Sequence, residues 1–225
     1  INGPGIATGR DSWVYNYSQS TINKKMSSLI HCYNKQINKE DVDTNPINIS
    51  WTVNLRKDLV KNKKHKFQDT EIVDSLYRPF CKHHLYFDRP FIERPGINSK
   101  LFPKESVENR VISLSSMGTQ NELSVLLSEN MIDYHFVGDT QCFPLHYYEE
   151  RDKQSPTIFD AAGDSEYIKR DGVSDFILKR ARENYGDRVT KEDIFYYVYG
   201  ILHSPDYRTT FANDLKKMLP RIPLV

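Results

Sequence analysis

The segment YRPFCKHHLYFDRPFIERPG, from Tyr77 to Gly96, mixes cationic and aromatic side chains at close spacing. Its cationic residues are Arg78, Lys82, Arg89 and Arg94, and three prolines interrupt it. An arginine can donate two hydrogen bonds to the edge of a guanine or to a phosphate. Prolines and packed aromatic rings stiffen a loop, and base reading depends on accurate placement of the side chain. These residue types therefore favour a nucleic-acid contact.

The same segment also has a purely structural interpretation. Its aromatic residues can pair across two buried strands, and Asp88 and Glu93 can form salt bridges with the arginines. The residue types alone do not decide between the two interpretations. Five further cations complete the candidate DNA-binding set: Arg10, Lys61, Lys63, Lys64 and Lys100. If the arginines are structural, the segment from Arg56 to Lys66 is the next place to seek a DNA surface.

Residues for catalysis, cofactors or metals do not form a recognisable pattern. Cys81, His83 and His84 lie close together, but a structural zinc site needs four ligands, usually in two spaced pairs. The glycines of GPGIATG do not have the spacing of a dinucleotide fingerprint or a P-loop. DTNPIN lacks the second proline and the aromatic residue of the loop with which amino-methyltransferases grip a base. We therefore expect a non-catalytic chain with no cofactor and no metal.

Composition and charge are those of a chain that can fold and bind an anion. Of its 225 residues, 38% are hydrophobic and 27% are charged, which permits a core. Residues 55–104 hold 12 Lys and Arg against 6 Asp and Glu, whereas residues 122–175 hold 4 against 12. This asymmetry suggests one face for an anion and another for solvent or a partner, although a solvated surface explains either run alone.

The cysteine count and the hydropathy indicate the compartment. The three cysteines are odd in number and far apart, which suits a reducing cytoplasm. No apolar run approaches the roughly 20 residues of a membrane span, and the first residues do not read as a signal peptide. Because they also lack an initiator Met, we expect a piece of a longer chain.

The elements predicted around these residues belong to the α+β class. Residues 18–39 show a helical stripe, with Ser20 or Thr21 as the expected N-cap. ISWTVNL reads as a short strand or a turn-bounded apolar run, and DTEIVDSLY reads as a short helix. Val111 to Met117 is predicted as a strand, followed by two or three more up to residue 150, with turns at Glu129-Asn130 and Gly138-Asp139.

The C-terminal part is predicted as three helices. Gly186 is the expected C-cap of the first, and Thr190 with Asp193 forms a capping-box pattern for the second. The third begins at Ser204 and Pro205 and is stopped by Pro220. The predicted architecture is thus a helical N-terminal part, a central irregular β-rich part and a C-terminal three-helix bundle. Residues 1–150 form the mixed recognition part, 151–172 a linker and 173–225 the helical part.

Three blocks carry a resemblance to a known family. YRPFCKHHLYFDRPFIERPG, IFYYVYGILHSPDYRTTFANDLKKMLPRIPL and GIATGRDSWVYNY resemble the C-terminal part of single-chain type ISP restriction–modification enzymes, whose relatives are often labelled as helicases. The resemblance covers residues 5–224 and is weakest in 107–169, as expected of a part that varies with the DNA sequence recognised. In that family one polypeptide carries a nuclease, a helicase-like ATPase, a coupler, an adenine methyltransferase and a target recognition domain.

The resemblance implies that this chain recognises a target sequence in double-stranded DNA. Its partners would be that DNA and the methyltransferase and helicase-like domains of the same parent chain, with ATP hydrolysis, methylation and cleavage performed elsewhere. Two other hypotheses stay open. The chain could be a structural module that couples the motor to the methyltransferase by protein contacts, or an unrecognised hydrolase. DNA recognition needs a continuous basic face, a coupling module needs an exposed apolar patch, and a hydrolase needs convergent carboxylates or a metal.

Overall fold

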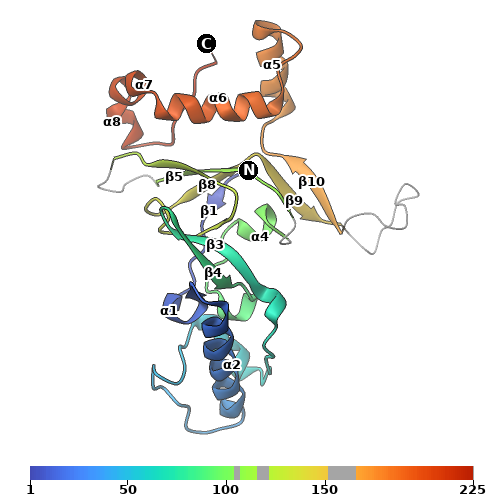
Figure 1. Ribbon diagram of the computed structural model, residues 1–225, viewed down its shortest axis with the longest axis vertical. Coiled ribbons are helices and arrows are strands. Elements are labelled where there is room, and N and C mark those ends of the chain that lie inside the picture. Colours follow the sequence, from blue (N-terminus) through green and yellow to red (C-terminus); the bar gives the residue numbers. More distant parts are fainter. Residues whose placement is uncertain (104–106, 116–121, 152–165, 225) are drawn as a thin grey trace, which may run out of the picture. The chain divides into compact units, whose positions relative to one another are not determined.

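The computed structural model describes residues 1–103, 107–115, 122–151 and 166–224. The chain divides into two compact units. We name them the N-terminal unit, which comprises Gly5–Gly96 and Asn130–Phe136, and the C-terminal unit, which comprises Ile1–Pro4, Ile97–Glu129 and Val137–Val225. Helices and sheets occur in both units, so the α+β class predicted from the sequence is correct (Figure 1).

The N-terminal unit is built on a four-stranded sheet of order β2-β4-β3-β7. Its strands are β2 (Tyr15–Asn16), β3 (Ile72–Arg78), β4 (Cys81–Tyr86) and β7 (Met131–Ile132). β3 pairs with β4 as an antiparallel hairpin, and β7 pairs with β3 in parallel. The helical elements are α1 (Asp11–Val14), α2 (Gln19–Gln36), α3 (Val53–Val60) and two short 3-10 helices, η1 (Asp69–Glu71) and η2 (Arg89–Phe91).

The predicted amphipathic helix is confirmed as α2. Its buried apolar residues are Ile22, Met26, Leu29, Ile30 and Tyr33, which recur at the spacing of one helical face. The predicted N-cap was wrong, because Ser18 precedes the first turn and its side chain accepts a hydrogen bond from the Thr21 amide. The helix therefore begins two to three residues earlier than expected.

Two local predictions before the hairpin were wrong. ISWTVNL is neither a strand nor a turn-bounded run, because Thr52 caps α3 by accepting from the Leu55 amide. DTEIVDSLY is not a helix, since only η1 precedes β3 there. Ile72, Val73 and Leu76 have helix-compatible spacing, but they lie in a strand that is paired on both sides, with β4 and with β7. Tertiary pairing overrides the local pattern.

The C-terminal unit contains a second four-stranded sheet, of order β1-β8-β5-β6. Its strands are β1 (Gly3–Pro4), β5 (Val111–Leu114), β6 (Val125–Ser128) and β8 (Gln141–Pro144). A separate hairpin joins β9 (His146–Glu150) to β10 (Tyr167–Asp171), and α4 (Asn98–Leu101) precedes β5. The helices α5 (Asp175–Tyr185), α6 (Lys191–His203), α7 (Pro205–Thr210) and α8 (Ala212–Leu215) follow.

The predicted strands of this region are largely confirmed. β5 accounts for the first part of the strand predicted from Val111, while its predicted end at Met117 lies outside the described residues. The segment after it holds β6, β7, β8 and β9, one more strand than the maximum expected. Gly138 and Asp139 have φ of 83° and 43°, as a turn at that position requires. Of the predicted linker 151–172, residues 152–165 lie outside the described part, and residues 167–171 form β10.

The caps predicted for the C-terminal helices are confirmed, but the three-helix bundle is not. Gly186 ends α5, Thr190 and Asp193 form the capping box of α6, and Ser204 caps α7. The third predicted helix is divided, because the chain changes direction at Phe211 between α7 and α8. The apolar stripe of α6 packs on the sheet and not only on helices: Phe195 and Leu202 share a core with Ile112, Leu114, Val125 and Leu145 (Figure 1).

Among the described residues, no helix has the length and apolar character required to cross a membrane.

Candidate nucleic-acid interface

The cationic and aromatic segment singled out in the sequence forms the β3–β4 hairpin and the turns that follow it. Pro79 and Phe80 are the two residues of its loop, between the paired residues Arg78 and Cys81. Phe80 has φ of 59° and a relative exposure of 91%. Proline followed by a left-handed residue is the pattern of a type II turn, in which that second place is normally glycine. A phenylalanine in this conformation costs roughly 1–2 kcal/mol of backbone strain.

Arg78 anchors the base of the hairpin loop. Its Nη1 donates to Asp133 Oδ1 and to the Tyr77 carbonyl at 2.6 Å, and its Nη2 lies 3.8 Å from Asp11 Oδ2. The guanidinium also lies 3.9 Å from the centroid of the Tyr77 ring. The predicted structural alternative named Asp88 and Glu93 as arginine partners, whereas the carboxylates that Arg78 contacts belong to Asp11 and Asp133.

Asp133 is the buried member of this network. Its side chain is 2% exposed, and its Oδ1 also accepts from the His135 amide at 2.8 Å. Burial raises the pKa of Asp133 to about 6, despite the opposing effects of the His135 amide and of Arg78. The loss of hydration on burial therefore disfavours the charged carboxylate more than its hydrogen bond and its ion pair favour it.

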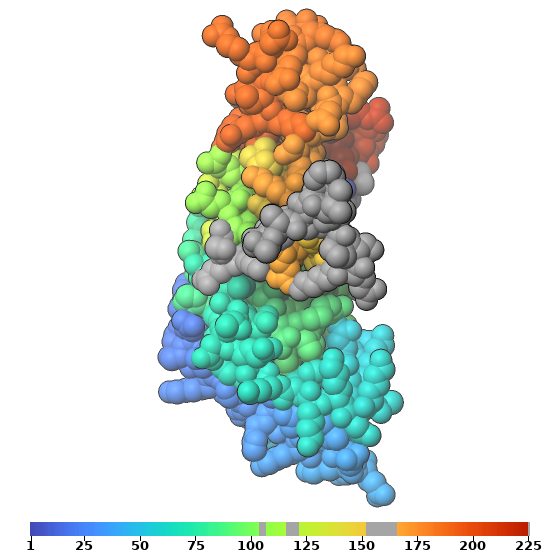
Figure 2. Space-filling model, turned by 90° about the vertical axis from the view of Figure 1, so that its right-hand side faces the viewer, coloured from blue at the N-terminus to red at the C-terminus, as the bar shows by residue number. Residues whose placement is uncertain are grey.

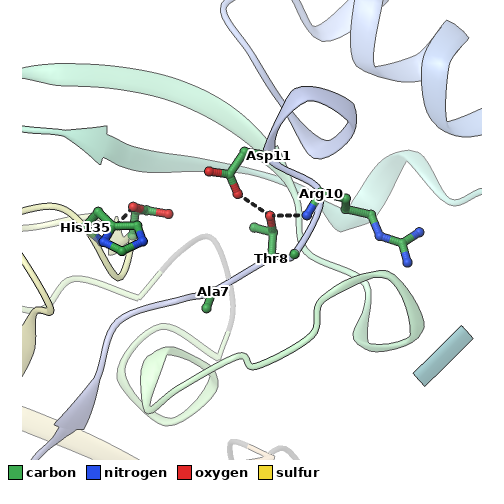
Figure 3. Close-up of a pocket in the computed structure, with 7 residues that line it drawn as sticks. Ala7, Thr8, Arg10, Asp11 and His135 are labelled. Atoms are coloured by element: carbon green, nitrogen blue, oxygen red, sulfur yellow. Dashed lines mark hydrogen bonds between the residues drawn. The ribbon is translucent and has the colours of Figure 1, made fainter. Parts of the chain in front are cut away.

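A cavity of about 370 Å³ lies beside this network in the N-terminal unit (Figure 3). It is lined by Ala7, Thr8, Gly9, Arg10, Asp11, Asp133 and His135. The Thr8 hydroxyl donates to Asp11 and accepts from the Arg10 amide at 3.0 Å. Asp11 and Asp133 could not be identified as anchors from sequence patterns, because the Arg78–Asp133 contact joins residues 55 positions apart.

The outward side of the hairpin is polar. Lys82 Nζ lies 2.6 Å from Asp74 Oδ2, and His84 Nδ1 lies 3.1 Å from Asp74 Oδ1. The three side chains are 56%, 40% and 37% exposed in the order Lys82, Asp74 and His84. This face therefore offers both donors and acceptors to a partner in solution.

Arg89 and Arg94 follow the hairpin and are both exposed. Arg89 Nη1 donates to the Ile92 carbonyl at 2.9 Å, which leaves other guanidinium donors available. The Arg94 backbone pairs with Ala7 in both directions, at 2.8 and 2.9 Å, and the structure gives its side chain no ion pair within the described residues. A fixed backbone with an uncommitted guanidinium suits a contact to an anionic partner.

The lysines predicted as DNA contacts that follow α3 are exposed. Lys61, Lys63 and Lys64 lie in the segment that follows the helix, and Lys63 Nζ is 4.0 Å from Asp58 Oδ2. Arg56, Lys57 and Lys66 are exposed in the same part of the chain. Lys100 is also exposed, but it belongs to α4 of the C-terminal unit.

Arg10 is placed differently from the other candidates. It is 4% exposed, its Nη2 donates to Thr52 Oγ1 at 2.7 Å, and its guanidinium lies 5.7 Å from the Phe91 ring centroid. Burial lowers the pKa of Arg10 to about 10, against an opposing effect of Glu93. Figure 3 shows its side chain directed away from Asp11. This burial does not support the predicted role of Arg10 as a DNA contact.

Cys81 and His83, which the sequence places close together, belong to a small polar and aromatic cluster. Cys81 Sγ lies 3.5 Å from His83 Nε2 and 3.1 Å from the Tyr17 hydroxyl, and His83 stacks on Tyr77. His84 points its Nδ1 to Asp74 on the other side of the strand. Within the described ranges, no group of three or more His, Cys, Asp or Glu side chains is arranged to hold a metal ion.

Comparison with known proteins identifies a family and several related structures. Residues 1–225 match the model of the type ISP C-terminal specificity domain. No curated protein matches the chain. Three solved structures resemble it over 99–100% of its length: a DrdV–DNA complex (28% identity, TM-score 0.88), a nuclease-deletion mutant of the type ISP restriction–modification enzyme LlaGI with a DNA substrate mimic (29%, 0.81), and the ATP-dependent type ISP restriction–modification enzyme LlaBIII bound to DNA (29%, 0.83).

The chain corresponds to 21%, 20% and 14% of those three chains, in the same order.

Proposed function

Because the chain belongs to the family of type ISP C-terminal specificity domains, we propose that it recognises the target sequence in double-stranded DNA for a restriction–modification enzyme. The observation that carries this proposal is the likeness over nearly the whole chain to three proteins whose structures contain DNA or a DNA mimic. The parent polypeptide would supply the helicase-like, nuclease and methyltransferase activities in the cytoplasm, and this chain would itself be non-catalytic.

The proposed DNA contacts come from exposed cations. In the N-terminal unit they are Arg89, Arg94, Lys82, Lys61, Lys63 and Lys64. Lys100 is proposed as a contact from the C-terminal unit. All of them precede residue 150, within the part expected to read DNA. Arg78 acts as the anchor of the hairpin loop, since its guanidinium is held by Asp133 and the Tyr77 carbonyl.

These cations divide into two roles by their surroundings. Lysines 61, 63 and 64 lie on an exposed, charged segment and suit phosphate contacts, which position the protein without reading sequence. Arg89 and Arg94 lie next to backbone that is fixed by η2 and by the pairing with Ala7. Because base reading needs an accurately placed guanidinium, we assign the sequence-reading role to these arginines before the lysines.

Selection of randomised duplexes on the full parent enzyme tests the proposal. We expect one sequence to be enriched, and we expect its enrichment to be lost when Arg89 and Arg94 are both changed to alanine. Lys24→Ala, which removes an exposed cation of α2 outside the proposed set, is the matched control and should select the same sequence. Selection of an unchanged sequence by the double variant would contradict the assignment of these arginines.

One observation favours a second candidate function, that of a structural coupling module. α5 buries only Ala181, while Phe176 and Tyr185 are 66% and 53% exposed (Figure 2, where α5 is orange). Exposed aromatic residues of this kind suit a protein contact. If coupling is the main function, Phe176→Ser in the parent enzyme should uncouple ATP hydrolysis from cleavage while leaving the selected duplex unchanged.

A further inference from the structure

Phe80 is a large apolar side chain that the fold does not use. It is 91% exposed at the loop of the β3–β4 hairpin. The neighbouring aromatic residues behave differently: the Tyr77 ring lies 4.6 Å from that of Tyr15 and 5.0 Å from that of His83, measured between centroids. Packing therefore accounts for Tyr77 but not for Phe80, whose left-handed backbone also disfavours this residue type.

The backbone beneath Phe80 is fixed by several independent contacts. The ring of Pro79 fixes the φ of Pro79 itself, just before Phe80, and the Arg78 guanidinium pairs with the buried carboxylate of Asp133. The Tyr77 hydroxyl donates to Asp11 Oδ2 at 3.2 Å. Because this backbone is rigid, the Phe80 side chain can insert into a partner without deforming the loop, as a wedge must.

The polar surroundings and the small size of the loop favour a DNA duplex over a protein as the partner of Phe80. Lys82 and Arg78 are 56% and 36% exposed beside the loop, and Lys82, Asp74 and His84 make the outward face of the hairpin polar. A protein contact through this tip would bury little more than one aromatic side chain, about 150–250 Å², against about 800 Å² per partner in a stable interface.

We propose that Phe80 is a wedge that enters between two adjacent base pairs of the bound duplex and unstacks that step. Proteins that bind the minor groove and bend DNA frequently insert apolar side chains such as phenylalanine, leucine or methionine between base steps. The insertion would bend the duplex and make recognition depend on how easily that step opens. This inference rests on the proposed function, because it presupposes that the parent enzyme binds a DNA duplex.

The test uses the full parent enzyme and duplexes that carry 2-aminopurine at one position at a time, since its fluorescence rises when it is unstacked. We expect a rise at one step with the wild-type protein and its loss with Phe80→Ala, together with about a tenfold loss of affinity. Phe80→Leu, which keeps an apolar side chain, should retain part of both. Ile47→Ala removes another side chain that is 80% exposed in the same unit, and should match the wild type.

The outcomes separate this inference from the proposed function. If the wild-type enzyme binds no duplex, the proposed function fails. If it binds and every 2-aminopurine signal persists in Phe80→Ala, the wedge is rejected, and the signals belong to a base opened by the methyltransferase part. If Phe80→Ala instead lowers the thermal stability of the parent enzyme without DNA, Phe80 packs on another part of that chain and the proposal is overturned.

Discussion

Single residues of the hairpin and of the segment after it separate into structural anchors and proposed DNA contacts. Arg78 has an ion pair with a buried carboxylate, whereas the Arg94 guanidinium has no such pair within the described residues. Arg94→Ala should therefore weaken binding while leaving the fold intact. For a phosphate contact, all duplexes are affected alike and the slope of log affinity against log salt falls by about one. For a base contact, the cost is about 1–3 kcal/mol on the target and one position of it is relaxed. Affinity titrations at several salt concentrations distinguish the two.

Arg78→Ala should act on stability. It leaves Asp133 buried without its cation, and we expect a loss of roughly 1–2 kcal/mol in the free energy of unfolding, below the roughly 3–5 kcal/mol of a fully buried pair because Arg78 is partly exposed. Urea unfolding of the chain measures this loss. Unchanged stability together with altered target choice would make Arg78 a DNA contact and remove its role as an anchor.

Asp133 should give the chain a characteristic pH dependence. Its pKa is raised from 3.8 to about 6 by burial, so the folded state holds this proton at higher pH than the unfolded state. The contribution of Asp133 to stability is therefore greatest below about pH 4 and declines as the pH rises towards 6. Asp133→Asn lacks this titration, so its stability relative to the wild type should rise by roughly 2–3 kcal/mol over that interval. Parallel unfolding curves of the two proteins from pH 4 to 7 would argue against it.

At the scale of elements, the hairpin loop combines an unfavourable residue with a firm support. Phe80→Gly places glycine at a φ of 59°, which glycine adopts without strain. We expect the free energy of unfolding to rise by about 0.5–1 kcal/mol, because relief of strain outweighs the greater freedom of glycine in the unfolded chain. The measurement is urea unfolding beside Ile47→Gly, an exposed position that gains no such relief. A destabilised Phe80→Gly would mean that Phe80 supports the loop.

The same scale explains which elements could be predicted. α6 was predicted correctly because a capping box and an apolar stripe lie within its own segment. The start of α7 followed from Ser204 and Pro205. α2 followed from its apolar stripe, although its N-cap was misplaced. β3 was mistaken for a helix because its partners β4 and β7 are what select the strand, and β7 lies more than 50 residues away along the chain. The division of the last predicted helix at Phe211 likewise has no local signal such as glycine or proline.

For the whole molecule, the sequence identified which cationic residues are candidates, but it could not show which of them are exposed contacts and which are buried or structural. Exposed and buried cations look alike in the sequence, and only the fold separates the exposed Arg94 from Arg10, which is buried against Thr52 and Phe91. Asp11 and Asp133, which hold the hairpin loop through Arg78, were missed because an anchor formed between distant segments has no sequence spacing. The family match extends over both units, so both belong to the specificity domain.

If the proposed function is correct, this chain determines which DNA sequence the parent enzyme acts on. The most direct test exchanges this segment in the parent enzyme for the corresponding segment of a relative with a different target, and maps adenine methylation on genomic DNA. We expect methylation to move to the target of the donor, at a rate within about tenfold of the original. Methylation that stays at the original sequence in an active, folded chimera would contradict it.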